Sequence, residues 1–185
     1  MAISKIPRHL FLDKAFLDFA YQDKAFPIAA GQTISHPYTV AYQSELLEVN
    51  PHEKVLEVGT GSGYQTALLL ELKAQVFTIE RQKELYQKTK SFLPKLGYHC
   101  MFFYGDGYKG LTNFAPFDKI IVTAGAPFVP EDLVKQLKVG GRMVIPVGDS
   151  DKQKMILITK KSEDDIEQRV LGDFSFVPLL PKKSQ

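Results

Sequence analysis

Residues 55–64 read VLEVGTGSGY, an apolar run that leads directly into a glycine-rich turn. The first four residues have the composition of a strand buried on both faces of a parallel sheet. Gly59, Gly61 and Gly63 lack a Cβ atom, so the backbone can turn sharply there and approach a ligand closely. Residues 65–72, QTALLLEL, favour a helix. We therefore expect a ligand site at the carboxyl end of this strand, where open α/β sheets bind ligands.

The glycine spacing narrows the class of ligand. A dinucleotide-binding loop has the spacing G-x-G-x-x-G, but Tyr64 occupies the third glycine position here. The glycines instead run G-x-G-x-G and follow Glu57, which is similar to the cofactor loop of S-adenosylmethionine-dependent methyltransferases. That cofactor carries an ammonium and a sulfonium and no phosphate, so a nearby acidic residue suits it. A tight strand-to-helix turn without a ligand is the alternative interpretation.

The composition is that of one globular domain. The chain has 185 residues, 44% of them hydrophobic and 24% charged, which indicates neither disorder nor a membrane protein. A net charge of +2 is too small to argue for a nucleic-acid partner. No apolar run approaches the roughly 20 residues that cross a bilayer, so we expect no membrane association. We also expect a monomer.

The cysteines and histidines of the sequence indicate the cellular compartment and whether a metal site is expected. Cys100 is the single cysteine, so no intrachain disulfide can form, and the first residues lack the apolar centre of a signal peptide. We therefore expect a cytoplasmic protein. The four histidines are scattered without zinc-type spacing, which predicts no metal site.

The segment before the central strand predicts two helices separated by a loop. Residues 10–24 suit a short amphipathic helix with Asp13 near its start and an apolar side that caps the core. Residues 26–37 contain prolines, a glycine and several polar side chains, and must form a loop. Pro37 fits the first position of a helix that runs to about Val49, with His36 at the N-cap position. Ser35 then lies just outside a helix N-terminus.

The remaining chain alternates strands and helices and then ends in two strands. We expect strands over 55–58, 75–80, 100–104, 119–123 and 142–147, and helices over 65–72, 82–96 and 130–137. Gly140 and Gly141 should break the last helix. Residues 154–160 and 169–177 should pair as an antiparallel hairpin around the acidic loop 162–165. This order predicts a single α/β domain with a mainly parallel, doubly wound, Rossmann-like sheet that ends in an antiparallel hairpin.

Two acidic residues follow predicted strands. Glu80 stands about 20 residues beyond the glycine loop, where a carboxylate can accept hydrogen bonds from ribose hydroxyls. Its alternative role is a solvated acid at a helix start. Asp106 lies between Gly105 and Gly107 after the third strand, a position from which it can reach a ligand amine.

Three segments together resemble one family. Residues 31–35 read GQTIS, residues 58–67 read VGTGSGYQTA and residues 105–107 read GDG. The joint pattern resembles protein-L-isoaspartate O-methyltransferases, and the likeness extends from about Arg8 to residues 176–179. The resemblance implies a helical and substrate-loop segment over 1–50, a cofactor-binding core over 51–148 and a C-terminal hairpin over 149–185.

The resemblance also implies an activity and a site. The enzyme would use S-adenosylmethionine to methylate the free α-carboxylate of isoaspartyl residues in damaged proteins, which enables repair through a succinimide. Ser35 would be the active-site serine, and Asp106 would take the adenine amino group. The cofactor-binding residues would be Gln32, Thr33, Ile34, Ser35, Glu57, Gly59, Thr60, Gly61, Glu80, Asp106 and Gly107.

The sequence departs from the family pattern at two places and leaves two other functions open. Ala29 and Ala30 precede the Gly-Gln pair where the family often has a glycine, and His36 stands where a small residue is common. The first alternative is a methyltransferase for another nucleophile, such as nucleic acid or a small molecule. The second is a non-catalytic module that binds S-adenosylmethionine. Ser35 itself could be only a loop or cap hydroxyl, because serine favours helix starts.

Overall fold

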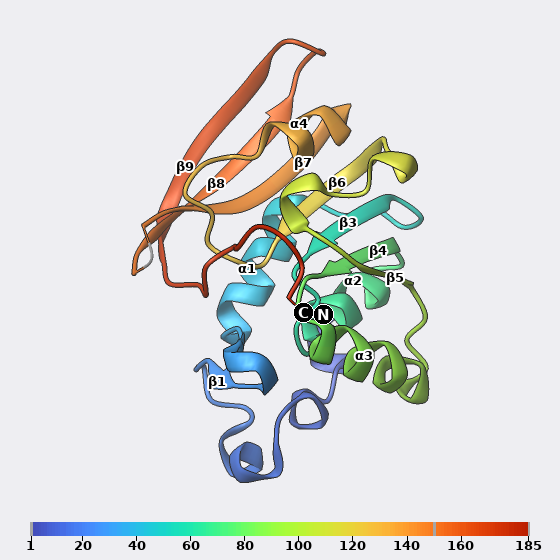
Figure 1. Ribbon diagram of the computed structural model, residues 1–185, viewed down its shortest axis with the longest axis vertical. Coiled ribbons are helices and arrows are strands. Elements are labelled where there is room, and N and C mark those ends of the chain that lie inside the picture. Colours follow the sequence, from blue (N-terminus) through green and yellow to red (C-terminus); the bar gives the residue numbers. More distant parts are fainter. Residues whose placement is uncertain (1, 150, 185) are drawn as a thin grey trace.

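A seven-stranded sheet forms the centre of the computed structural model, which describes residues 2–149 and 151–184 (Figure 1). The strand order is β5-β4-β3-β6-β7-β8-β9. Neighbouring strands from β5 to β7 are parallel, whereas β8 runs antiparallel to both β7 and β9. The strands are β3 (Lys54–Val58), β4 (Gln75–Glu80), β5 (Met101–Tyr104), β6 (Phe117–Val122), β7 (Leu137–Gly148), β8 (Gln153–Lys160) and β9 (Ile166–Phe174). The predicted parallel sheet with a terminal antiparallel hairpin is confirmed.

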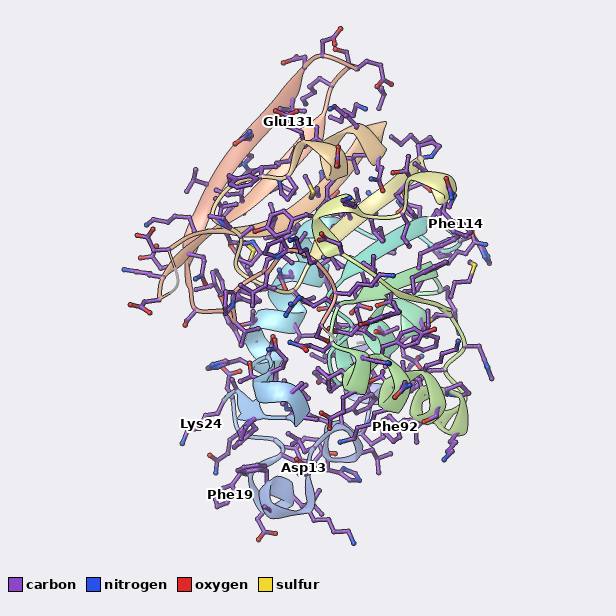
Figure 2. The ribbon with its side chains drawn as sticks, viewed as in Figure 1. Asp13, Phe19, Lys24, Phe92, Phe114 and Glu131 are labelled. Carbon is purple, nitrogen blue, oxygen red and sulfur yellow. The ribbon has the colours of Figure 1, made fainter. Side chains whose placement is uncertain are left out.

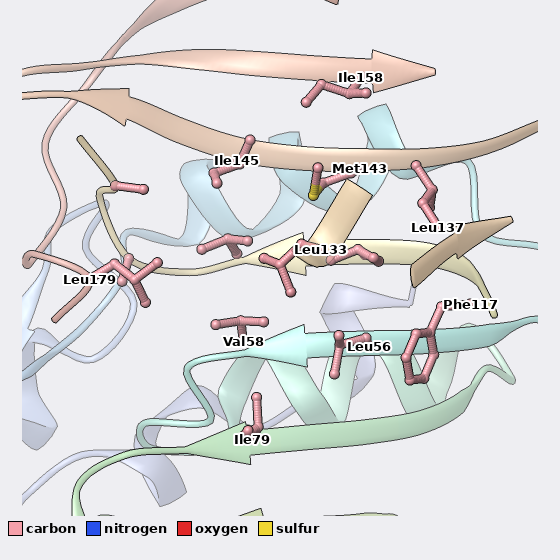
Figure 3. Close-up of a cluster of buried hydrophobic side chains, with 14 of the residues drawn as sticks. Leu56, Val58, Ile79, Phe117, Leu133, Leu137, Met143, Ile145, Ile158 and Leu179 are labelled. Carbon is pink, nitrogen blue, oxygen red and sulfur yellow. The ribbon is translucent and has the colours of Figure 1, made fainter. Parts of the chain in front are cut away.

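Helices cover both faces of this sheet. The helices are α1 (Pro37–Leu47), α2 (Tyr64–Glu71), α3 (Lys83–Phe92) and α4 (Glu131–Gln136), with α3 continued by a 3₁₀ turn over Leu93–Leu96. On one face, Leu47 of α1 and Leu69 of α2 belong to a buried cluster with Val55 of β3. On the other face, Leu133 of α4 packs into the larger cluster shown in Figure 3. Burial on both faces explains why the central strands are almost wholly apolar.

The residues of β3 alternate between these two faces. Leu56 and Val58 join the cluster under α4, while Val55 faces α1 and α2. Glu57 therefore points toward α2, where its carboxylate accepts a 2.5 Å hydrogen bond from the Thr66 hydroxyl. Side chains alternate between the two faces along a strand, and both faces of this strand are covered. The acid at position 57 therefore lies inside the protein.

The N-terminal segment differs from the predicted helix over residues 10–24. Two short 3₁₀ turns, Arg8–Phe11 and Lys14–Phe19, stand there, and Asp13 between them has an extended backbone. The Arg8 guanidinium donates a 3.0 Å hydrogen bond to the carbonyl of Lys24, so the chain doubles back over 16 residues. A continuous α-helix of that length would be about 24 Å long and would separate the two ends. Figure 2 shows Asp13, Phe19 and Lys24 together at one end of the molecule.

The expected apolar cap on this segment forms only in part. Phe11 and Ala20 are buried, and Phe11 makes edge contacts with the rings of Tyr64 and Phe92. In contrast, the side chains of three apolar residues in the same stretch are more than 40% exposed, namely Leu10, Leu17 and Phe19.

A residue from the N-terminal segment caps α1. Two short strands, β1 (Phe26–Pro27) and β2 (Thr33–Ile34), pair antiparallel inside the expected loop and lead to the helix. His36 occupies the N-cap position as predicted but makes no side-chain cap bond. Instead, the carboxylate of Asp23 accepts a 2.9 Å hydrogen bond from the backbone N–H of Tyr38. The first turn of α1 and the residues before it are thereby tied to the N-terminal segment.

Gly140 and Gly141 do not end a helix. Helix α4 stops at Gln136, and both glycines lie within β7, beside a register shift between β6 and β7. A Cβ on Gly141 would lie 2.8 Å from the carbonyl oxygens of Asp118 and Lys138. The glycine is thus required by the close approach of two backbones at a strand irregularity, and the prediction that this pair breaks a helix is wrong.

The C-terminal segment crosses the carboxyl ends of the parallel strands. Residues 175–184, red in Figure 1, leave β9 and return over the front of the sheet. The N–H of Gly125 donates to the carbonyl of Val177, and the N–H of Leu179 donates to the carbonyl of Gly125. At the end of this segment, Ser184 donates from its backbone N–H and its hydroxyl to the carbonyl of Arg81.

Candidate functional site

The glycine loop lies at the carboxyl end of β3. Gly59, Gly61 and Gly63 have φ values of 99°, 53° and 86°, in the region that L-residues rarely adopt. The Thr123 hydroxyl, from the end of β6, donates a 2.6 Å hydrogen bond to the carbonyl of Gly59, and a Cβ on that glycine would lie 2.4 Å from the hydroxyl oxygen. The loop is therefore fixed by both its own backbone and the neighbouring strand.

A cleft opens above this loop. Nine of the eleven predicted cofactor-binding residues line it: Gln32, Thr33, Ile34, Ser35, Gly59, Thr60, Gly61, Glu80 and Gly107. They come from the loop before α1, the glycine loop, the end of β4 and the turn after β5. Segments separated by more than 70 residues in the sequence thus meet at one edge of the sheet, as expected for a doubly wound fold.

Glu80 is held in the cleft wall by backbone donors. Its carboxylate accepts hydrogen bonds from the N–H of Gly61, at 2.9 Å, and of Gln82, at 2.8 Å. The side chain is only 5% exposed. Each bonded oxygen retains another lone pair for a ligand hydroxyl. Gly61 is itself tied to α3, because the hydroxyl of Thr89 donates to its carbonyl at 2.7 Å.

Asp106 lies beside the cleft and is already bonded. One carboxylate oxygen accepts from the N–H of Tyr108, at 3.0 Å, and the other accepts from the N–H of Lys182, at 2.9 Å. Asp106 therefore caps the 3₁₀ turn Gly107–Lys109 and anchors the C-terminal segment. It is not among the residues that line the cleft, whereas its neighbour Gly107 is.

Glu57 lies behind the glycine loop and outside the cleft lining. Its side chain is 0% exposed, and burial raises the pKa of its carboxyl from 4.5 to about 8, although the hydrogen bond from Thr66 acts in the opposite direction. The carboxyl is therefore mostly protonated at neutral pH. The structure does not bring this predicted site residue to the cleft surface.

The loop of residues 28–35 contributes its last four residues, Gln32 to Ser35, to the cleft lining. The N–H of Ile28 donates a 2.8 Å hydrogen bond to the carbonyl of Gln32, which closes the turn. Ala30 and Gly31 both have positive φ, at 57° and 64°. Ala30 is one of the alanines that stand where the family often has glycine, so the departure falls on a strained position.

Ser35 lies where the cleft meets a second, smaller recess. Both are lined by Thr33, Ser35, Thr123 and Val177. The second recess is completed by residues before β1, at the start of α1 and in the C-terminal segment: Ala25, His36, Thr39, Ser175 and Phe176. Ser35 is partly exposed. The serine is thus accessible from two sides.

Several residues of the cleft were not predicted from the sequence. They come from α1, the glycine loop, α2, the residues after β4 and β6, and the C-terminal segment, and they include Val40, Gln43, Ser62, Tyr64, Gln65, Arg81, Thr123, Ala124, Val177, Pro178, Leu179 and Leu180. The family resemblance includes residues 176–179. Their place in the cleft depends on the turn after β9, which only the structure shows.

Over residues 2–149 and 151–184, no three His, Cys, Asp or Glu side chains are grouped in a way that could hold a metal ion. In the same part of the chain, no helix has the length and hydropathy needed to span a bilayer.

Comparison with known proteins identifies the family. The family profile described as protein-L-isoaspartate(D-aspartate) O-methyltransferase matches residues 1–184. The chain belongs to this family. A protein-L-isoaspartate O-methyltransferase of Christiangramia forsetii is 66% identical over 99% of this chain and 86% of the relative, and one of Flavobacterium johnsoniae is 62% identical with the same coverage.

Solved structures agree with this membership. A structure named protein-L-isoaspartate O-methyltransferase has a TM-score of 0.86 and 31% identity, and it is covered by this chain over 60% of its length, with 96% of this chain aligned. A Plasmodium falciparum protein described in the same way, solved with S-adenosyl-L-homocysteine, has a TM-score of 0.82 and 28% identity over 97% of this chain and 88% of that one.

A member of the protein-L-isoaspartate O-methyltransferase family is an S-adenosylmethionine-dependent enzyme, and the residues present fit that cofactor. The cleft has a glycine-lined floor, a buried carboxylate at Glu80 for hydroxyl groups, and no cluster of basic side chains for a phosphate among its lining residues. The amide oxygen of Gln65 in the cleft wall has no hydrogen-bond partner in the part of the chain that the structure describes. Such a buried acceptor favours a ligand with donor groups.

Proposed function

We propose that the cleft holds S-adenosylmethionine with its ribose at Glu80 and its methionyl part over Gly59 to Gly61, and that Ser35 holds the carboxylate that is methylated. The reaction of the family, methyl transfer to the free carboxylate of an isoaspartyl residue, is the activity of this chain. The observation that carries the site assignment is the position of Ser35 at the junction of two recesses.

Glu80 supports the orientation of the cofactor. Its carboxylate is fixed by the N–H groups of Gly61 and Gln82, so it needs no rearrangement to accept bonds from two ribose hydroxyls. The adenine then lies toward β5, beside Gly107. Asp106 takes the adenine amino group through its second lone pairs, or after Lys182 moves away from it. Thr60 and Glu57 support the glycine loop from the sheet side. The hydroxyl of Thr60 is hydrogen-bonded to that of Thr78 in β4, and Thr78 lies beside Glu57 in the sheet.

Ser35 orients the acceptor. An isoaspartyl residue presents an α-carboxylate, which titrates near pH 3.3–3.7 and is ionised at neutral pH. The site therefore needs no general base. The Ser35 hydroxyl donates a hydrogen bond to one carboxylate oxygen and leaves the other free to attack. The backbone of the acceptor peptide lies in the second recess, between Thr39 of α1 and Phe176.

The chain contributes alignment and exclusion of water. S-adenosylmethionine supplies an electrophilic methyl group when bound. The walls formed by residues 32–35 and 177–180 hold the attacking oxygen in line with that methyl group and remove water from the carboxylate. A bond forms between oxygen and the methyl carbon as the carbon–sulfur bond breaks, and the products are a methyl ester and S-adenosylhomocysteine. In this family the ester closes to a succinimide, which begins repair.

The test is a matched pair of peptides that differ only in one linkage. Labelled methyl from S-adenosylmethionine should enter the isoaspartyl peptide and not the aspartyl peptide, because isomerisation adds a methylene to the main chain and moves the free carboxylate to the α-carbon. Equal labelling of both peptides would indicate another nucleophile. Labelling of neither, with intact cofactor binding, would indicate a non-catalytic binding module.

We also propose that the enzyme acts as a cytoplasmic monomer without a nucleic-acid or membrane partner. The single cysteine supports the cytoplasmic assignment, and the small net charge of +2 supports the absence of a nucleic-acid partner. Light scattering in solution tests the monomer, and a dimer mass would contradict it.

A further inference from the structure

A buried amide in the cleft wall has an unused acceptor. Gln65, in the first turn of α2, is 6% exposed and lines the cleft. Its amide oxygen Oε1 has no hydrogen-bond partner within residues 2–149 and 151–184. Buried polar atoms are almost always paired, so an orphan acceptor at the edge of a ligand cleft needs an explanation.

The orientation of this amide is fixed by a chain of hydrogen bonds. The hydroxyl of Ser44 in α1 donates to the carbonyl of Val40 at 2.8 Å, because a carbonyl can only accept. With its one proton used, the Ser44 oxygen must accept from Gln65, and the amide nitrogen Nε2 lies 2.9 Å from it. Rotating the amide would place two acceptors against each other. Oε1 is therefore turned away from Ser44.

The position of Gln65 selects one donor of the cofactor. The cleft runs across the end of β3 from Glu80 on β4 to α1, where Gln43 donates a 3.0 Å hydrogen bond to the carbonyl of Val122 at the end of β6. Gln65 is bonded to α1 and so belongs to the end opposite Glu80. Ribose and adenine occupy the Glu80 end in the proposed orientation. The donor group that remains at the other end is the methionyl ammonium.

We infer that Gln65 binds the methionyl ammonium of S-adenosylmethionine through Oε1 and that Ser44 is the positioning residue that orients it. This inference rests on the cofactor orientation proposed above. An amide suits the task because it accepts from a cation without adding a negative charge next to the substrate carboxylate at Ser35. A carboxylate at the same position would repel that anion. The same cleft thus places an acid at its ribose end and a neutral acceptor at its reacting end.

The experiment compares two ligands by calorimetry. S-adenosylhomocysteine carries the ammonium, and its deaminated analogue has hydrogen in place of the amino group. Gln65→Met keeps the length of the side chain and removes the amide. It should weaken S-adenosylhomocysteine binding about tenfold and leave the deaminated analogue unchanged, because one hydrogen bond to a charged group is lost. Equal weakening of both ligands, or of neither, would overturn the inference.

Two further variants distinguish a hydrogen bond to the ammonium from a packing role of the Gln65 side chain. Gln65→Glu retains an acceptor and should keep the preference for the ammonium-bearing ligand, even if methyl transfer slows. Ser44→Ala removes the orienting hydroxyl and should reduce that preference by less than Gln65→Met does. Loss of the preference in Gln65→Glu would contradict the acceptor role. Failure of the unaltered protein to bind S-adenosylhomocysteine would overturn the proposed cofactor site itself, whereas normal binding with unchanged variants would overturn this inference alone.

Discussion

The sheet and the N-terminal segment, residues 2–36, build the two walls of the cleft in different ways. Glu80 and the glycine loop are held by hydrogen bonds between neighbouring strands and the first residues after them. Ser35 is held by a segment of short turns, a two-residue strand pair and a cap bond from Asp23 to α1. The wall proposed to hold the cofactor is thus part of the seven-stranded sheet, whereas the wall proposed to hold the acceptor depends on short turns, a two-residue strand pair and a cap bond. Changes in the two regions should therefore have separable effects.

The largest difference between an effect on turnover and an effect on cofactor affinity is expected at Ser35. Ser35→Ala should lower turnover by up to about a hundredfold and leave the Kd for S-adenosylhomocysteine unchanged. Removal of one preorganised donor costs about 10²–10³ in rate where charge develops, but here charge is neutralised, so the effect lies at or below the lower limit. Steady-state rates and calorimetry on the same preparation check this. An equal loss of cofactor affinity would show that the two walls are not independent.

The reciprocal change is Glu80→Ala on the sheet side. It should raise the Kd for S-adenosylhomocysteine about tenfold or more, since hydrogen bonds to a charged group contribute about 1.5–3 kcal/mol. Glu80→Gln is the matched control, because it keeps the shape and one acceptor and should have a smaller effect. Turnover at saturating cofactor should change little. An unchanged Kd in Glu80→Ala would remove the ribose assignment.

The buried carboxyl of Glu57 should make the unfolding free energy depend on pH. Its pKa is raised to about 8 in the folded chain, against 4.5 normally, so between these values the folded state keeps a proton that the unfolded state releases. Its stabilising contribution is complete below about pH 4.5 and is lost as pH rises toward 8, by about 1.4 kcal/mol per pH unit. Glu57→Gln should remove this slope.

The measurement for Glu57 is urea denaturation of both proteins at several pH values between 5 and 8. The difference in unfolding free energy between Glu57→Gln and the unaltered chain should grow in favour of glutamine as pH increases. A constant difference would mean that the buried carboxyl does not titrate in this range.

The smallest effect is expected in the N-terminal segment, at Ala30. Its φ of 57° is unfavourable for any residue with a Cβ, at a cost of roughly 1–2 kcal/mol, so Ala30→Gly should raise the unfolding free energy by about 1 kcal/mol. Ala29→Gly, one residue earlier, is the control and should not stabilise. Denaturant unfolding distinguishes them, and a destabilised Ala30→Gly would indicate that the loop gains nothing from glycine.

The sheet was predictable because its signals are local. The strand VLEV, the glycines after it and the helix formers beyond them specify one β/α unit without reference to distant residues. The helix predicted over residues 10–24 does not form, because the structure there depends on partners 15 or 16 residues away in the sequence. The bond from Arg8 to Lys24 and the cap from Asp23 to Tyr38 have no local pattern. Gly141 was misread for the same reason, since its close contact is with Asp118.

The candidate site was predictable to a similar degree. Residues inside motifs, such as Ser35, Gly59 and Glu80, come together in the cleft. Gln43 and Gln65 could not be assigned, because nothing in the sequence shows which side of a helix faces the cleft before the packing of α1 on the sheet is known. The position of Glu57 on the inner face of β3 follows from strand alternation, but only once the face covered by α2 is identified.

The meeting of the two recesses at Ser35 has a kinetic consequence. The two recesses share a wall but have different remaining linings, so the proposed assignment lets cofactor and peptide occupy the enzyme at the same time. The reaction should then pass through a ternary complex, so double-reciprocal plots at several fixed peptide concentrations should intersect and should not be parallel. A single displacement of this kind also inverts the configuration of a chirally labelled methyl group, since no enzyme side chain carries the methyl on the way.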